Sequence, residues 1–190
     1  MNKNKPFGNV ASEEHRAVAK EVGEEGIVLL KNQGNILPID INKVKTIAVI
    51  GENAIKMMTV GGGSSSLKVK YETLPLDGIK SRFGKQAEVK YARGYVGDPG
   101  GEYNGVKSGQ DLKDDRSPET LLNEAVELAK KSDFVIFVGG LNKSDHQDAE
   151  GVDRKSYGLP YNQDNVIAAL AKANKNFAVV FVSGNAVAMP

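Results

Sequence analysis

The stretch that decides the fold is Phe134-Val135-Ile136-Phe137-Val138-Gly139-Gly140. A run of β-branched and aromatic residues that ends in glycines is typical of a strand buried on both faces of a parallel sheet. In an open α/β sheet, the loops after the carboxyl ends of the strands form the ligand crevice. The segment that soon follows this strand, residues 145–154, is crowded with ionisable side chains. We therefore expect the functional site in this acidic loop, with Glu150 as the strongest candidate.

Apolar runs and helical patterns alternate along the rest of the chain. Strands are expected at 46–50, 87–91 and 177–182, and helices at 12–22, 74–83, 117–131 and about 162–173. This alternation predicts an α/β fold, a three-layer sandwich with helices around a mostly parallel sheet. The strands at 46–50 and 177–182 should be buried, the strand at 87–91 is a modest one, and residues 27–30 should form a short buried strand or helix end.

The 190 residues fit one domain with a hydrophobic core. Residues 1–11 are expected to be a linker or arm, and residues 12–190 to be a partial α/β domain. The chain stops one loop past the strand at 177–182, so the edge of the sheet would lack a covering helix. We therefore expect the domain to be truncated at its C-terminus, and the exposed end of the sheet to favour self-association.

Composition excludes several classes of function. Lys+Arg 25 against Asp+Glu 24 gives a formal net charge of +1, and the basic residues are scattered, which argues against a nucleic-acid partner. The chain has no cysteine, which excludes disulfides, thiolate metal sites and thiol catalysis. Its apolar runs are far shorter than the roughly 20 residues that span a bilayer, so no membrane partner is expected. Residues 1–5 lack the apolar core of a signal peptide.

The glycine-rich loops do not match known phosphate cradles. The loop Gly61-Gly62-Gly63-Ser64-Ser65-Ser66 lacks the spacing of a P-loop, and neither Gly51 nor Gly139-Gly140 begins a G-x-G-x-x-G motif. A flavodoxin-like nucleotide binder is therefore a distant alternative. Backbone donors and serine hydroxyls suit a neutral polyol, so we expect Gly62, Gly63 and Ser64 to contact a sugar.

Metal binding explains the acidic loop poorly. A calcium loop that starts at Asp145 would place Gln147 and Ala149 where oxygen ligands of the Asp/Asn type are required. A zinc site needs more than His146, and the only other histidine is His15 in the first predicted helix. We expect no metal and no cofactor.

Two interpretations of the acidic loop stay open from spacing alone. It is either a solvated charged loop in which Asp153 and Arg154 form local ion pairs, or a loop that presents a general acid/base. Glu150 lies between small residues and suits the second role, although Asp145, Asp148 and Asp153 are alternatives that spacing does not exclude.

A series of motifs resembles the C-terminal domain of glycoside hydrolase family 3. They occur in the family's order along nearly the whole chain. The motif around the acidic loop is Glu-Gly-x-Asp-Arg…Leu-x-Pro…Gln, here Glu150-Gly151-Val152-Asp153-Arg154, Leu159-Pro160 and Gln163. The other matching pieces are His15-Arg16-Ala17, Ile27-Val28-Leu29-Leu30-Lys31-Asn32, Ile36-Leu37-Pro38-Ile39, Ile47-Ala48-Val49-Ile50-Gly51, Gly61-Gly62-Gly63-Ser64-Ser65, Pro75-Leu76-Asp77-Gly78-Ile79 and the segment 182–190.

The resemblance implies a retaining β-glycosidase that acts from the non-reducing end, with a β-linked oligosaccharide or aryl β-glycoside as substrate. It implies that Glu150 is the acid/base glutamate, that Asp153 and Arg154 beside it belong to the substrate site, and that the aspartate nucleophile lies on an N-terminal barrel domain. Nothing in this chain matches that barrel. We therefore predict that the isolated chain is inactive, and a non-catalytic sugar-binding or ligand-binding module is the alternative. The chain has no tryptophan, so a sugar-stacking tryptophan seen in some family members is absent here.

Overall fold

The computed structural model describes residue 4 and residues 8–59, 63–67, 69–98, 102–103, 106–107 and 110–188. The chain divides into two compact units, Met1–Leu37 and Pro38–Pro190. In chain order, the regular elements of the described residues are α1 (Glu13–Glu25), η1 (Gln33–Asn35), β1 (Thr46–Ile50), η2 (Glu52–Ala54), η3 (Gly63–Ser65), α2 (Pro75–Phe83), β2 (Glu88–Ala92), β3 (Glu102–Tyr103), β4 (Val106–Lys107), α3 (Pro118–Lys130), β5 (Phe134–Gly140), α4 (Gln163–Ala173) and β6 (Phe177–Val182).

The first unit contains α1, and Ser12 caps it as expected by accepting a hydrogen bond from the backbone N–H of His15. The prediction for residues 27–30 is wrong. No strand or helix is assigned there, and the side chains of Ile27, Val28, Leu29 and Leu30 are all exposed. A unit of this length supplies too little apolar surface to bury such a run by itself.

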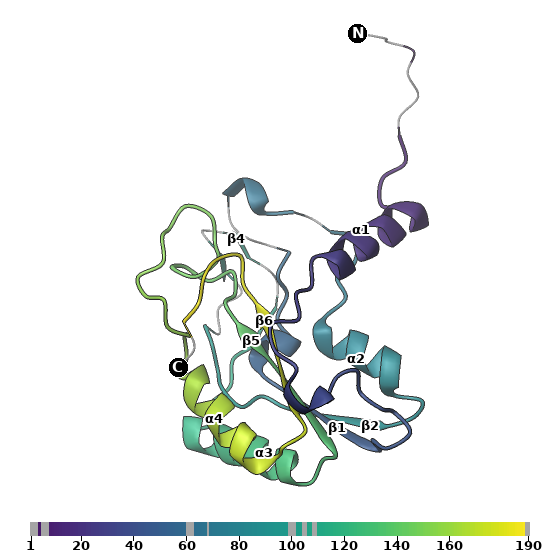
Figure 1. Ribbon diagram of the computed structural model, residues 1–190. Helices are drawn as coiled ribbons and strands as arrows, with labels where there is room; N and C mark the ends of the chain where they lie inside the picture. The colour runs from purple at the N-terminus through teal and green to yellow at the C-terminus, as the bar shows by residue number, and fades with distance from the viewer. Residues whose placement is uncertain are drawn as a thin grey trace. The chain divides into compact units, whose positions relative to one another are not determined.

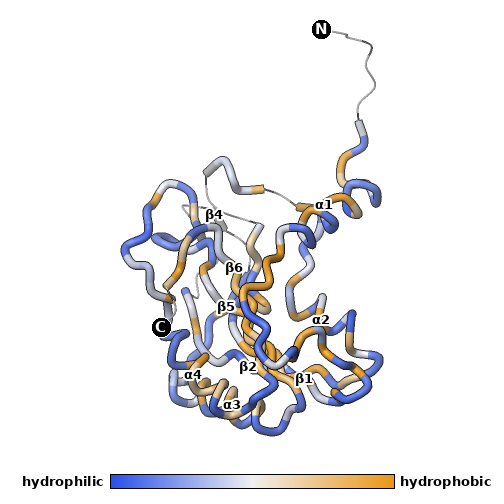
Figure 2. The backbone as a smooth tube through the Cα atoms, viewed as in Figure 1, coloured by the Kyte–Doolittle hydropathy of each residue, from blue (hydrophilic) through white to orange (hydrophobic). Residues whose placement is uncertain are grey.

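The second unit is built on a parallel sheet with the strand order β2-β1-β5-β6 (Figure 1). The central strands are apolar along their length, as Figure 2 shows for β1 and β5, and every residue of β5 is buried. The Phe134–Gly140 stretch therefore forms the doubly covered strand that its sequence predicts.

Helices cover both faces of the sheet. Small and branched side chains of α3 and α4, Ala125, Ala129, Val166 and Leu170, pack on one face, against alternate residues of β1 and β5. Helix α2 lies on the other face, beside β2 (Figure 1). Helix α3 begins as its sequence predicts, with Ser117 as the cap and Pro118 in the first turn. The predicted α/β sandwich is confirmed.

Strand β6 differs from its prediction. It pairs with β5 in register, but none of its residues is fully buried, and Val180 is 46% exposed. As the edge strand of the described sheet, β6 has a neighbouring strand on one side only, which leaves its side chains less covered than those of β5.

No described helix is long and apolar enough to cross a membrane.

Candidate active site

The strand order creates a topological switch point between β1 and β5. The chain leaves β1 towards β2 on one side, whereas β5 leads to β6 on the other side, so the loops after β1 and β5 diverge. Such a switch point is where open α/β sheets bind ligands. Gly51, with φ +119°, lets the two strand ends approach, because a Cβ there would lie 2.0 Å from the carbonyl oxygen of Val138. The Nδ2 of Asn53 then donates to the carbonyl of Leu141 at 2.9 Å.

Gln163 anchors the end of β5. Its side chain is fully buried, accepts a hydrogen bond from the N–H of Gly140 at 2.8 Å and donates to the carbonyl of the same residue at 2.8 Å. A side-chain amide thus satisfies both backbone groups of the last strand residue. The position from which the next loop departs is therefore set by the first turn of α4.

Glu150 lies beyond that strand and contacts the serine loop, residues 63–66. Its carboxylate accepts hydrogen bonds from the hydroxyl of Ser64 at 2.8 Å and 3.0 Å, and from the N–H of Ser65 at 3.0 Å. The side chain is exposed, and the Ser64 hydroxyl, followed by the Ser65 N–H, lowers the pKa of Glu150 below its ordinary value. The structure thus brings together two predicted site residues that are 86 positions apart.

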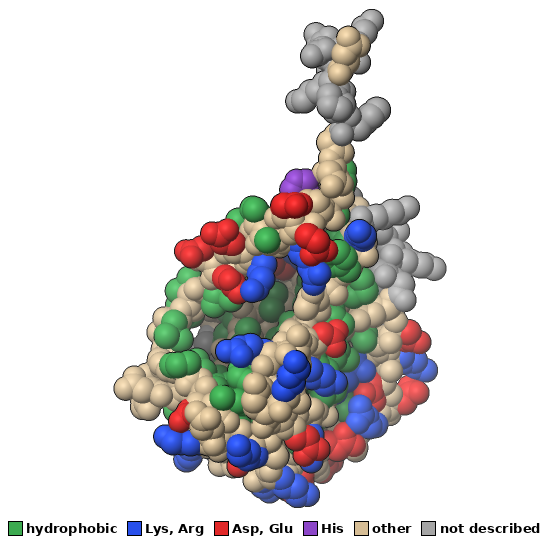
Figure 3. Space-filling model, turned by 90° about the vertical axis from the view of Figure 1, so that its right-hand side faces the viewer, with side chains coloured by type: hydrophobic (Ala, Val, Ile, Leu, Met, Phe, Trp, Pro, Cys, Tyr) green, Lys and Arg blue, Asp and Glu red, His purple; other side chains and the backbone are tan. Residues whose placement is uncertain are grey.

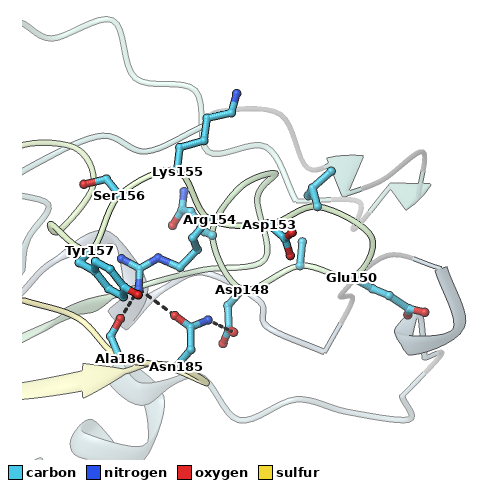
Figure 4. Close-up of a pocket in the computed structure, with 12 residues that line it drawn as sticks. Asp148, Glu150, Asp153, Arg154, Lys155, Ser156, Tyr157, Asn185 and Ala186 are labelled. Atoms are coloured by element: carbon cyan, nitrogen blue, oxygen red, sulfur yellow. Dashed lines mark hydrogen bonds between the residues drawn. The ribbon is translucent and has the colours of Figure 1, made fainter.

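The acidic loop also borders a pocket of about 680 Å³, which is bounded on another side by Asn185 and Ala186. Figure 4 shows Arg154 directed towards Asn185 and Ala186, whereas Glu150 lies at the opposite end of the residues that line the pocket. Glu150 is therefore one of the residues that line this pocket, and its side chain is exposed to solvent.

Arg154 is engaged within the chain. Its guanidinium donates to the side chain of Asn185 at 2.7 Å, to the carbonyl of Ala186, and to the carbonyl of Gly158 at 3.3 Å. These bonds tie the acidic loop to the loop after β6. A substrate contact by Arg154, which stays a prediction, would have to share donors that already serve this tie.

Asp148 also links the acidic loop to the loop after β6 through hydrogen bonds, which the sequence did not predict. It accepts hydrogen bonds from the N–H of Gly184 at 2.8 Å and from Asn185 Nδ2 at 3.2 Å, and Lys143 lies 3.7 Å away. Asp153 is exposed, and its backbone carbonyl is within 2.9 Å of His146 Nδ1. The solvated-loop interpretation expected local ion pairs of Asp153 and Arg154, and among the described residues neither side chain forms a salt bridge. A charged residue in a loop gives no sequence signal that separates such ties from a solvated side chain.

Of the other two residues that were predicted to contact a sugar, Gly62 and Gly63, the structure describes only Gly63. Gly62 lies outside the described residues, and Gly63 begins the short helix η3, which carries Ser64 and Ser65. Among the described residues, no group of three or more His, Cys, Asp or Glu side chains is placed to hold a metal ion. On the face in Figure 3, lysines and arginines are interspersed with aspartates and glutamates, with no patch of a single sign.

Comparison with known proteins identifies the family of this arrangement. The model of the glycosyl hydrolase family 3 C-terminal domain matches residues 27–190. The β-glucosidase BoGH3A of Bacteroides ovatus is 50% identical over 196 residues, which covers 100% of this chain and 25% of that protein. A β-xylosidase of Formosa agariphila is 34% identical over 180 residues, covering 91% of this chain and 22% of that protein.

A solved structure agrees with the sequence relatives. The crystal structure of a family 3 β-glucosidase from Bifidobacterium adolescentis matches with a TM-score of 0.73 at 33% identity, and it covers 98% of this chain and 24% of that chain. The chain therefore spans about a quarter of the length of the relatives it matches. The resemblance predicted from the motifs is confirmed: this chain belongs to the family of glycosyl hydrolase family 3 C-terminal domains.

Proposed function

We propose that this chain is the C-terminal domain of a retaining, exo-acting β-glycosidase of the β-glucosidase type, and that Glu150 is its general acid/base. The observation that carries the proposal is the convergence of Glu150 with Ser64 beside the switch point of the sheet. A proton-transferring carboxylate needs a loop that is held in place yet open to a substrate. The ties through Asp148 and Arg154 supply the first condition, and the exposure of Glu150 supplies the second.

In the proposed reaction, Glu150 protonates the leaving-group oxygen while a carboxylate nucleophile forms a glycosyl-enzyme. Glu150 then takes a proton from the water that hydrolyses this intermediate. The nucleophile belongs to an N-terminal barrel domain, which this chain does not contain. Retaining chemistry requires the two carboxyl groups to lie roughly 5–5.5 Å apart, so the isolated chain should not hydrolyse glycosides.

The state of Glu150 in this structure corresponds to its role as a base. Hydrogen bonds from Ser64 and Ser65 favour the carboxylate and lower its pKa, whereas a general acid must hold a proton near neutral pH. A neighbouring negative nucleophile and the exclusion of water by substrate would both raise the pKa of Glu150. The proposal therefore assigns the acid form to the assembled, substrate-bound enzyme.

The first prediction concerns Glu150→Gln in the full-length enzyme. Loss of proton transfer should reduce kcat on alkyl β-glucosides by about 10²- to 10⁴-fold, the usual contribution of a general acid. The loss should be much smaller for the glycosylation step on aryl β-glucosides or β-xylosides with acidic leaving groups, because these depart without a proton. Steady-state and burst kinetics across a leaving-group series measure both effects.

Asp145→Asn is the matched control, since Asp145 is an exposed carboxylate on the same loop. It should retain activity within a few-fold on every substrate. Equal losses for Glu150→Gln across all leaving groups would overturn the acid/base role.

The lowered pKa of Glu150 favours one alternative, a non-catalytic sugar-binding module in which the carboxylate only accepts hydrogen bonds. In that case Glu150→Gln would change the affinity for a sugar without changing turnover by the full-length protein.

A further inference from the structure

A tyrosine outside the acidic loop connects two of the crevice loops. The hydroxyl of Tyr161 donates to Asp98 Oδ2 at 2.5 Å and accepts a hydrogen bond from Nε2 of Gln147. Asp98 belongs to the loop after β2, whereas Gln147 belongs to the acidic loop after β5. One phenol oxygen therefore joins segments that are 49 positions apart in the sequence, from residue 98 to residue 147.

Gln147 connects the Tyr161 hydroxyl to the backbone of the loop that carries Glu150. Its Oε1 accepts a hydrogen bond from the N–H of Asn142 at 3.0 Å, and its own N–H donates to the carbonyl of Ser144 at 3.2 Å. The N–H of the next residue, Asp148, donates to the carbonyl of Asn142 at 3.0 Å. The segment 142–148 is thereby closed into a compact turn, and Glu150 follows two residues after it.

A buried ionic cluster fixes the position of Asp98, at the other end of this series of hydrogen bonds. Glu52, which is fully buried, accepts hydrogen bonds from Arg93 at 2.8 Å and from the N–H of Gly97 at 2.6 Å, and it pairs with Lys56 at 3.3 Å. The Nζ of Lys56 also donates to the carbonyl of Asp98 at 3.2 Å. A charge cluster with these mutual hydrogen bonds defines one geometry, because breaking any pair leaves a buried charge unpaired. The backbone at Asp98 is therefore a rigid anchor.

Close packing at Gly97 reinforces the anchor. A Cβ at this position would lie 2.6 Å from Glu52 Oε1 and 3.2 Å from Cε2 of Tyr161, so only glycine lets the cluster and the tyrosine ring approach together. The ring of Tyr161 stacks on that of Tyr95, with centroids 6.2 Å apart and an angle of 11° between the planes.

The backbone at Tyr161 is strained. Tyr161 and Asn162 both have φ of +59°, a left-handed conformation that is unfavourable for a bulky residue such as tyrosine and persists only where its surroundings demand it. Burial, and then the Asp98 carboxylate, raise the pKa of Tyr161 to about 12, so the phenol stays a neutral donor at any pH where a glycosidase works.

We propose that Tyr161 is a positioning residue for Glu150. Its hydroxyl transmits the rigid geometry of the Glu52 cluster, through Asp98 and Gln147, to the turn from which Glu150 is presented. The inference rests on the proposed acid/base role. Tyr161 has no part in proton transfer itself.

The test is Tyr161→Phe in the full-length enzyme. Phenylalanine keeps the ring stacking and removes both hydrogen bonds of the hydroxyl. Misplacement of a catalytic group by about 1 Å costs up to roughly 100-fold in rate, so we expect a 10- to 100-fold loss in kcat on alkyl β-glucosides with little change in KM. On aryl glucosides with acidic leaving groups, the loss in the glycosylation step should be less than about 3-fold. Hydrogen exchange should become faster in peptides that cover 142–154 and stay unchanged in α3.

Tyr71→Phe is the control for removal of a phenol oxygen outside the acidic loop, since Tyr71 lies on the segment before α2; it should leave hydrogen exchange in 142–154 and the leaving-group dependence as in wild type. The same rate loss on every leaving group, or unchanged exchange in 142–154, would overturn the positioning role. If Glu150→Gln itself shows no leaving-group dependence, the proposed function fails. If Glu150→Gln shows that dependence and Tyr161→Phe does not, only the positioning role fails.

Discussion

Glu150 illustrates how two hydrogen-bond donors set the state of a residue. The Ser64 hydroxyl and the Ser65 N–H both stabilise the ionised carboxylate, and Ser64 contributes the larger effect. Because Ser64 lies on the serine loop rather than beside Glu150 in the chain, the geometry of that loop affects the pKa of Glu150. The same serine was predicted to contact the sugar, and that role stays a prediction.

At this scale we predict the effect of Ser64→Ala on pH dependence. Removing the hydroxyl removes the largest cause that lowers the pKa of Glu150, so this pKa should rise. In kcat/KM of the full-length enzyme, the limb at high pH reports loss of the proton from the acid/base, and it should therefore move to higher pH. The limb at low pH, which reports the nucleophile, should not move.

A profile whose high-pH limb stays in place would show that Ser64 and Glu150 do not interact in the working enzyme. Ser156→Ala is a matched control, because the Ser156 hydroxyl accepts a hydrogen bond from the N–H of Gly158 rather than bonding to Glu150.

At the scale of the element, α4 has two roles. Gln163 in its first turn satisfies the end of β5, and Val166 and Leu170 bury the inner face of the helix against the sheet. The helix thus connects the hydrophobic core to the crevice loops, because Tyr161 lies two residues before Gln163 in the chain. Loss of packing along α4 should affect the fold before it affects the chemistry.

We predict that Leu170→Ala lowers the free energy of unfolding by about 2–5 kcal/mol, the usual cost of a cavity left by a buried leucine. Leu170 is 0% exposed. The same change at Leu67, which is 62% exposed, should cost about 0.5 kcal/mol or less. Urea unfolding of the two variants measures the difference, and similar losses for both would contradict the burial of α4.

At the scale of the whole molecule, the chain spans about a quarter of its relatives and carries one of the two carboxylates that the proposed reaction needs. We predict that the 190-residue chain alone does not hydrolyse aryl β-glucosides or β-xylosides. Mixing it with a separately prepared barrel domain should restore turnover, and Glu150→Gln in this chain should abolish that recovery.

Activity from the chain alone would mean that both catalytic carboxylates lie within it, which would contradict the division of the active site. The predicted self-association of the chain and the boundary between an arm at 1–11 and the domain at 12–190 stay predictions. For self-association we expect the edge strand β6, where Val180 is 46% exposed, to be the pairing surface, and sedimentation of the chain as a clean monomer would count against it.

The sequence by itself determined the fold class, the strand from Phe134 to Gly140, the cap of α3 and the family. These depend on local signals, namely apolar periodicity, capping residues and short motifs, which are legible without knowledge of distant contacts. It also made Glu150 a candidate, because Glu150 lies in a loop after the carboxyl end of a buried parallel strand, and ligands of open α/β sheets bind at that edge. Burial of residues 27–30 and of β6 was predicted wrongly, since periodicity reports what a segment could bury and not whether anything covers it.

Only the tertiary structure decided what the polar side chains contact. Ser64 meets Glu150 because the strand order places the loops after β1 and β5 at one crevice. Arg154 donates hydrogen bonds to the loop after β6, and Tyr161, whose backbone is left-handed, contacts Asp98 and Gln147. A hydrogen bond requires a partner within about 3 Å and in the right direction. For residues tens of positions apart, those distances are set by the packing of the whole sheet and not by any local pattern.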